Sequence, residues 1–297
     1  MKTISDICLG TAKLGLPDYG FPSSYKKSKF IARDYLEQLG SLGVVKFDTS
    51  PRYGNSEEIL GRYIKSATLA PFISSKIDKL KLNNKKSNMH MLSSVKSSLQ
   101  KLNKEYLDVC YLHQHHVSII KDSYIQDGLM DLKSLGLIKN IGVSIYTIDE
   151  CKAAIEAEIF DYIQIPTSII DTSIYSNYIK DQSKKVKFVA RSIFLQGSIF
   201  NKNKIINKII DGEMLLEAIK SIEFLAKQNN LTLASLALGF VGSLKNIDHI
   251  IMGSLSLNNM KKNIALLNLS LPQDLIEKIL KISNKTASWK NPQNWGY

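Results

Sequence analysis

The sequence predicts an α/β fold in which a single (β/α)8 TIM barrel with a parallel eight-stranded core spans the 297 residues. Three observations predict it. Eight short β-rich runs alternate with longer segments of helical spacing, which is the pattern of repeated strand–helix units. The length suits one such barrel, and no low-complexity linker divides the chain. We therefore expect one barrel domain over 1–297, in which 285–297 form a flexible or pocket-lining tail.

Each expected strand is a short apolar run bounded by Gly, Pro, Asn, Asp or Ser. Buried parallel strands have this form because both of their faces are covered. In chain order the runs are 6–11, 44–48, 72–76, 107–112, 141–144, 162–165, 187–191 and 249–253.

Between the runs lie amphipathic segments whose apolar residues recur at helical spacing. They cover 30–39, 59–63, 91–102, 129–135 and 215–225, and a last one restarts at 270–272 and continues to 282. Gly40 and Gly43 end the first segment, and Gly136 ends the fourth as the residue after a helix C-cap. Ser56 is expected to cap the second. The stretch 195–212 has no clear period and predicts a loop at the ligand-facing end.

The composition is that of an ordinary globular protein, with 44% hydrophobic and 22% charged residues, which excludes a disordered or fibrous chain. No run approaches the ~18 apolar residues that a membrane-spanning helix needs. The first residues lack the apolar core of a secretion signal. We therefore expect a cytoplasmic protein with no membrane partner, and a monomer is the default.

The net charge of +12 arises from 39 basic and 27 acidic side chains. Such a charge is compatible with nucleic acid, with an anionic ligand or with solubility alone. No basic helix carries interleaved aromatic residues, and no zinc-finger or RNA-recognition signature occurs, so nucleic acid is not an expected partner. The cysteines, Cys8, Cys110 and Cys151, show no CxxC spacing and are expected to be reduced core residues.

A barrel of this type places its chemistry on the loops at the C-terminal ends of its strands. Here those ends carry polar residues or glycine, namely Thr11, Asp48, Lys76, His113, Ser144, Gln164, Arg191, Gly253 and Ser254. A complete ring of such ends is more than packing requires. The sequence therefore predicts a reactive site at this face of the barrel.

The turn after the second run predicts a general acid. Pro51 and Gly54 force a turn that aims Tyr53 at the barrel mouth. A lone loop tyrosine is more simply a surface residue, but here Asp48 and Lys76 stand at neighbouring strand ends. An ammonium beside a phenol favours the phenolate and lowers its pKa, and a carboxylate keeps the lysine charged. Asp48, Tyr53 and Lys76 together predict a tuned general acid.

His113 follows the fourth run, where an imidazole can donate to a carbonyl oxygen and polarise it. With His115 and His116 nearby, a metal-dependent hydrolase is an alternative. Such a barrel needs His-x-His at its first strand and further metal ligands at later strand ends. The remaining histidines, His90 and His249, fall at no strand end, so no metal is expected.

This set resembles the aldo-keto reductase family, barrel enzymes that bind a nicotinamide cofactor without a Rossmann domain. The lack of a GxGxxG fingerprint agrees with this and argues against a doubly wound dehydrogenase. The specific part is Asp48, Tyr53, Lys76 and His113 in that order. The matching pieces extend from residue 5 to about 285 and are Leu9-Gly10-Thr11-Ala12 with Gly15, Phe47-Asp48-Thr49-Ser50 through Tyr53-Gly54, Glu57 and Leu60-Gly61, Ser75-Lys76, Tyr106-Leu107-Asp108 through His113, Gly142-Val143-Ser144, Gln164, and Gly253-Ser254 with Asn263.

The resemblance implies hydride transfer from the nicotinamide to the carbonyl carbon of an aldehyde or ketone, with Tyr53 protonating the oxygen. Lys76 and Asp48 would tune Tyr53, and His113 would orient the carbonyl. Ser144 and Gln164 would hold the carboxamide, and the loop from 253 to 263 would bind the adenosine end. The implied cofactor residues are Gly10, Thr11, Ser144, Gln164, Arg191, Gly253, Ser254, Lys261 and Asn263.

The start of the helix near Leu257, with Lys261 or Lys262, offers a site for a 2′-phosphate, which favours NADP(H) over NAD(H). Two residues depart from the family pattern. Ile145 stands where the family often has Asn, and Arg191 stands where it often has an aromatic residue that stacks on the nicotinamide. Arg191 can stack through its guanidinium plane, hold a cofactor phosphate or contact an anionic substrate.

Segments 166–171 and 191–197 look like those of a subgroup found among bacterial surface-sugar and nucleotide-sugar genes, which suggests a sugar-like or anionic carbonyl substrate. The alternative function is a non-catalytic nucleotide-binding barrel that acts as a sensor or subunit. Intact Tyr53, Lys76 and His113 argue against it, since a sensor needs the cofactor pocket but not the acid.

Overall fold

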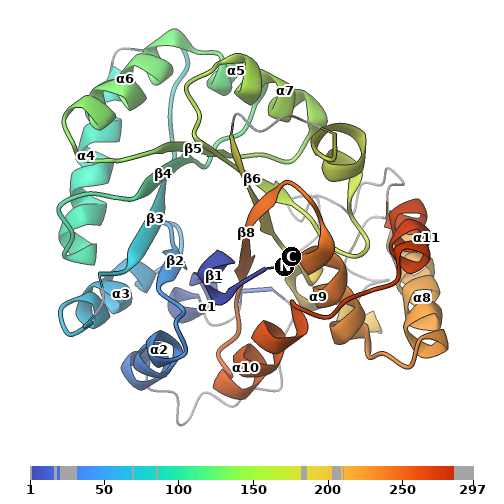
Figure 1. Cartoon of the computed structure of the whole chain (residues 1–297). Helices are drawn as coiled ribbons and strands as arrows, with labels where there is room; N and C mark the ends of the chain where they lie inside the picture. Colours follow the sequence, from blue (N-terminus) through green and yellow to red (C-terminus); the bar gives the residue numbers. More distant parts are fainter. Residues whose placement is uncertain are drawn as a thin grey trace.

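The computed structural model describes residues 2–16, 19–20, 32–68, 70–84, 86–181, 186–202, 209 and 211–283. Eight parallel strands close into a barrel in sequence order, with the last strand paired to the first. Figure 1 shows this ring of strands at the centre of the molecule, with the helices around it. The predicted (β/α)8 barrel is confirmed. The expected tail, 285–297, lies outside the described residues.

Every predicted apolar run overlaps its strand, and the bounds are identical or differ by at most two residues. The strands are β1 (Ile7–Gly10), β2 (Lys46–Asp48), β3 (Phe72–Ile77), β4 (Val109–Leu112), β5 (Ile141–Ser144), β6 (Tyr162–Pro166), β7 (Lys187–Arg191) and β8 (Ile247–Met252). The register brings the strand ends level, because Asp48 pairs with Gly10 and Ser74, and Ser144 pairs with Gln164. The ring of polar ends therefore lies at one face of the barrel.

Each predicted amphipathic segment coincides with a helix in its described part, except at residue 135 and at 270–272, which lie outside the helices. The α-helices are α1 (Ala12–Gly15), α2 (Ala32–Ser41), α3 (Ser56–Ile64), α4 (Lys86–Leu102), α5 (Val117–Ile120), α6 (Ser123–Ser134), α7 (Ile148–Glu156), α8 (Gly212–Gln228), α9 (Leu233–Ser243), α10 (Leu257–Leu266) and α11 (Gln273–Ser283). Two short 3₁₀ segments, Ile4–Asp6 and Leu195–Phe200, and a π-helical turn, Tyr175–Ile179, complete them. Gly136 follows the C-cap of α6 with φ 72°, as predicted.

Three sequence-based expectations need correction. Gly40 does not end the first helix, because it lies within α2, and only Gly43, with φ 91°, follows the helix end. Ser56 does not cap α3, because Asn55 occupies the N-cap position. The Ser56 hydroxyl instead donates to the Thr11 hydroxyl at 2.7 Å, which ties the start of α3 to the end of β1. The stretch 195–212 is not a plain loop, since it begins with the 3₁₀ turn Leu195–Phe200; residues 203–208 and 210 lie outside the described part.

The core lies between the strands and the helices. Phe47, Phe188 and Phe240 are among its largest fully buried side chains, and each contributes roughly 1.5–3 kcal/mol by leaving water. All three cysteines are buried and free, as predicted. Among the described residues, no helix combines the length and apolar character needed to cross a membrane.

Candidate active site

A buried ion pair forms the floor of the site. Lys76 Nζ lies 2.6 Å from Asp48 Oδ2 and donates to the Thr49 carbonyl oxygen at 2.9 Å, and the paired side chains are only 2% and 5% exposed. Asp48 Oδ1 accepts from Ser74 at 3.0 Å and from Gln164 Nε2 at 2.6 Å. A buried pair is tolerated when further hydrogen bonds satisfy its remaining lone pairs, and here both carboxylate oxygens are satisfied.

Tyr53 is held over this floor by two interlocking glycines. The Tyr53 N–H donates to the Ser50 carbonyl oxygen at 2.9 Å and closes a turn, and Gly54 adopts φ 56°. Gly15 of α1 packs so closely against this turn that a Cβ there would lie 1.7 Å from the Tyr53 carbonyl oxygen. Only glycine fits at 15, so α1 fixes the place of the turn that carries Tyr53.

The structure brings together all four predicted catalytic residues. Lys76 Nζ lies 5.2 Å from the centre of the Tyr53 ring, and the His113 ring meets that ring edge-on at 6.3 Å between centroids. Tyr19, on the segment after α1, lies 6.3 Å from the same ring. Tyr53 Oη has no hydrogen-bond partner among the described residues, so its proton is available to a ligand.

The environment of Tyr53 favours the protonated phenol. Burial raises the pKa of Tyr53 far above its usual range, and the Asp48 carboxylate adds to this, whereas the positive charges of Arg191 and Arg52 oppose it. The expected lowering of this pKa is therefore wrong, because burial outweighs the nearby cations. A phenol that keeps its proton is nevertheless the form that a general acid requires.

His113 is a neutral imidazole. Burial lowers the pKa of His113 to about 3, and the charges of Lys76, Arg52 and Arg191 act in the same direction. Its Nδ1 lies 3.4 Å from the Ser50 hydroxyl. A neutral imidazole carries one N–H, which can donate to an oxygen placed between His113 and Tyr53.

Arg191 connects the ends of β5 and β7. Its Nε donates to Ser144 Oγ at 3.2 Å, and its Nη2 donates to the Ile145 carbonyl oxygen at 2.9 Å. The guanidinium carbon lies 4.2 Å from the centre of the Tyr146 ring. Gln164, from β6, donates from Nε2 to Asp48 Oδ1, and its buried amide also lies within hydrogen-bond reach of the Tyr111 hydroxyl.

The ends of β1 and β8 approach each other closely. A Cβ at Gly253 would lie 2.8 Å from the Gly10 carbonyl oxygen, and Tyr35 of α2 donates to the Ser254 carbonyl oxygen. Thr11 is fully buried, and its N–H and hydroxyl both donate to the Asp48 carbonyl oxygen at 3.0 Å. Gly10 and Thr11 therefore join β1 to its neighbours.

The start of α10 lies just beyond the end of β8. The Ser256 hydroxyl accepts from the Asn259 N–H at 3.3 Å and caps the helix. Lys261 and Lys262 are exposed and Asn263 is half-buried, so the first turns of α10 present two ammonium groups to solvent.

His115, His116 and Glu150 form a second polar group, next to Tyr146. His115 Nδ1 and Glu150 Oε1 are 2.7 Å apart, and Glu150 Oε2 accepts from the backbone N–H of Tyr146 and Thr147. The ligand atoms of His115, His116 and Glu150 lie within 4.8 Å of one another, so the group has the composition of a metal site. Glu150 was missed in the sequence because it lies inside a helix, where the capping pattern Thr-x-x-Glu was its only signal.

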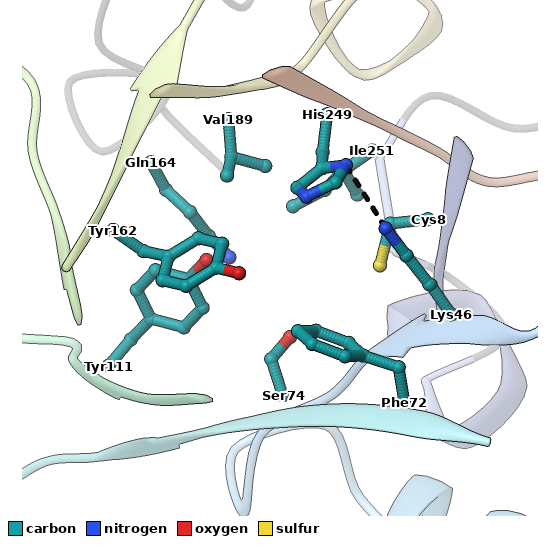
Figure 2. Close-up of a pocket in the computed structure, with 10 residues that line it drawn as sticks. All are labelled: Cys8, Lys46, Phe72, Ser74, Tyr111, Tyr162, Gln164, Val189, His249 and Ile251. Carbon is teal, nitrogen blue, oxygen red and sulfur yellow. Dashed lines mark hydrogen bonds between the residues drawn. The ribbon is translucent and has the colours of Figure 1, made fainter. Parts of the chain in front are cut away.

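Below the floor, a small cavity lies inside the barrel (Figure 2). It is lined by Cys8, Lys46, Phe72, Ser74, Tyr111, Tyr162, Gln164, Val189, His249 and Ile251. Its free volume of about 10 Å³ admits about one water molecule. The cavity is therefore too small for a substrate. The four predicted catalytic residues lie instead at the face of the barrel that carries Tyr53.

Several solved structures and curated proteins are similar to the chain. An aldo-keto reductase from Bacillus halodurans, in its holo form, superposes with a TM-score of 0.71 over 95% of this chain and 94% of its own, at 16% identity. The D-arabinose 1-dehydrogenase of Saccharomyces cerevisiae is 31% identical over 158 residues, which is 50% of this chain and 45% of that protein. The chain thus matches less than half the length of that relative.

An NADH-specific methylglyoxal reductase of Escherichia coli is 24% identical over 91% of both chains. The model of the Aldo/keto reductase family matches residues 6–284, a range that includes all eight strands and the four predicted catalytic residues. The chain belongs to the aldo/keto reductase family.

Proposed function

We propose that the chain catalyses the NAD(P)H-dependent reduction of an aldehyde or ketone, with Tyr53 as the general acid. The observation that supports this most is the cluster at the barrel mouth. A protonated phenol and a neutral imidazole face each other above the buried pair of Lys76 and Asp48. This arrangement can hold a carbonyl oxygen and give it a proton.

When bound, the reduced nicotinamide supplies a hydride to the carbonyl carbon. His113 donates its N–H to the carbonyl oxygen and fixes its direction. Tyr53 gives its proton to the oxygen as negative charge develops there, and the Lys76 ammonium stabilises the phenolate that remains. Asp48 keeps Lys76 charged and in place, so it acts through Lys76.

The residues at the ends of β5 and β6 fit a nicotinamide carboxamide. Ser144 and Gln164 occupy paired positions on these strands, and a hydroxyl and an amide together offer the donors and acceptors that a carboxamide needs. Gly10, Thr11, Gly253, Ser254 and Asn263 complete the cofactor residues that we propose.

We favour NADP(H) over NAD(H) because the first turns of α10 combine backbone N–H groups with Lys261. The name of the Escherichia coli relative specifies NADH, so the choice is open to experiment in this family. We expect Lys261→Ala to weaken NADPH binding and to leave NADH binding unchanged, as measured by calorimetric titration. Equal effects on both nucleotides would place the 2′-phosphate elsewhere.

The test of the function is NADPH oxidation in the presence of aldehydes, pentoses and methylglyoxal, the last two chosen from the names of the relatives. We expect Tyr53→Phe to lower the rate by at least about 100-fold while NADPH still binds. Tyr124→Phe, on the outer helix α6, is the control and should retain the rate. Undiminished activity of Tyr53→Phe would exclude Tyr53 as the acid.

If the wild-type protein binds nucleotide but reduces no carbonyl compound, the sensor or subunit function is favoured instead. The proposal also includes a small sugar-like or anionic substrate, a cytoplasmic location and a monomer. Size-exclusion chromatography with light scattering checks the last of these.

A further inference from the structure

Arg191 is a rigidly held cation at the end of β7. Two backbone or side-chain acceptors, the Ile145 carbonyl oxygen and Ser144 Oγ, fix its guanidinium, and the Tyr146 ring supports one face at 4.2 Å. A planar guanidinium held in this way loses little further freedom when a ligand arrives.

The charge of Arg191 is not neutralised by a carboxylate within the described part of the chain. The other cations at the barrel mouth have such partners, since Lys76 pairs with Asp48 and Arg52 Nε lies 2.8 Å from Asp78 Oδ2. The field of Arg191 reaches the reacting groups, because it lowers the pKa of both Tyr53 and His113. A fixed, unpaired positive charge therefore lies beside the place where hydride transfer is proposed.

We propose that Arg191 makes the site bind the reduced nicotinamide cofactor in preference to the oxidised one. The inference rests on the proposed function, in which Ser144 contacts the carboxamide. Because Arg191 Nε donates to Ser144 Oγ at 3.2 Å, a ring whose carboxamide is held by Ser144 lies close to the guanidinium.

The two forms of the cofactor differ at this point by one charge. The oxidised ring is a cation and the reduced ring is neutral, whereas their phosphates are the same. A neighbouring guanidinium therefore repels only the oxidised ring, and the phosphates do not affect the ratio of the two dissociation constants. The oxidised cofactor would leave the site readily, so a reductase with this residue resists inhibition by its own product.

The experiment measures dissociation constants of NADPH and NADP⁺ by calorimetric titration without substrate. We expect the wild type to bind NADPH more tightly, and Arg191→Gln and Arg191→Met to reduce the ratio of the NADP⁺ to the NADPH constant by about tenfold. Arg191→Lys, which keeps the charge, should stay close to the wild-type ratio. Circular dichroism and thermal melting check that each variant is folded. Two uncharged variants are used so that the test still works if one of them fails to fold.

Arg52→Gln is the matched control, because Arg52 lies at the same mouth but is paired with Asp78 and is 59% exposed. Its field is therefore weaker, and its ratio should change much less than that of the Arg191 variants. If removing Arg191 weakens both forms equally, the residue contacts a cofactor phosphate or only packs, and the inference is wrong. If the wild type binds both forms and no variant changes the ratio, the inference alone fails. If the wild type binds neither form, the proposed function fails with it.

Discussion

At the scale of single residues, the buried ion pair of Lys76 and Asp48 is the feature of the site whose disruption should most lower the stability of the fold. Replacing Lys76 by Met leaves the Asp48 carboxylate buried without its cation, so we expect a loss of about 3–5 kcal/mol in the free energy of unfolding. Urea denaturation measures this. Lys121→Met removes the exposed pair with Glu156 and should cost only about 0–1 kcal/mol. Similar losses in both variants would contradict a special role for burial.

The ionisation of Tyr53 and His113 predicts a broad pH range for catalysis. Burial raises the pKa of Tyr53 and lowers that of His113 to about 3, so the phenol stays protonated and the imidazole stays neutral between about pH 6 and 9. The turnover number with saturating NADPH and aldehyde should therefore be nearly constant over this interval. A tenfold decrease as the pH rises to about 9 would place the pKa of the acid near ~8, below the ordinary ~10 of a tyrosine, and would contradict the raised pKa.

At the scale of elements, α1 determines where the Tyr53 turn lies. Gly15→Ala places a methyl group against the Tyr53 carbonyl oxygen, so the turn must move, and we expect a large loss of turnover together with lower stability. Gly136→Ala is the contrast, because no atom lies within 4 Å of its added methyl group. That variant should lose about 1–2 kcal/mol from its positive φ and keep its turnover. Equal activity of the two variants would mean that α1 does not position Tyr53.

The elements that the sequence predicts best are those whose signal is local. Each strand was identifiable because a short apolar run ends at a polar residue or glycine, as β5 does at Ser144. Helix α9 was not predicted, because its run from Leu236 to Val241 is buried on every side and shows no stripe. The hydroxyl of Ser56 suggested a cap, but tertiary contact with Thr11 prevailed.

In the site, too, the sequence predicts local features and misses contacts between residues far apart in the chain. Asp48, Lys76 and His113 could be named because strand ends meet at one face of a barrel. The contacts of Arg191 with Ser144 and Ile145 join residues about 46 positions apart, and no local pattern carries them. The pKa of Tyr53 depends on how deeply the phenol is buried, which one sequence does not contain.

At the scale of the whole molecule, two half-buried histidines link stability to acid. Burial lowers the pKa of His113 to about 3 and that of His249 to about 4, below the ~6.5 of an unfolded histidine. Between these values only the unfolded chain binds the protons, so stability is complete above about pH 6.5 and decreases as the pH falls toward 4. We expect a lower melting temperature at about pH 5 than at about pH 7.5, by scanning calorimetry.

His249→Phe tests this link, because it keeps an aromatic ring against Tyr162 and removes one titrating group. The variant should lose less melting temperature than the wild type over the same pH interval. An identical decrease in both proteins would assign the acid sensitivity to other groups.

The reactivity of the three buried thiols can report when the ring of strands opens. Burial raises the pKa of Cys8, and it raises those of Cys110 and Cys151 to about 12, so an alkylating reagent finds almost no thiolate in the intact barrel. Cys8 belongs to β1, Cys110 to β4 and Cys151 to the outer helix α7. If iodoacetamide in mild urea modifies Cys8 and Cys110 at one common rate, the ring of strands opens as a unit. If it modifies Cys151 earlier, α7 detaches first.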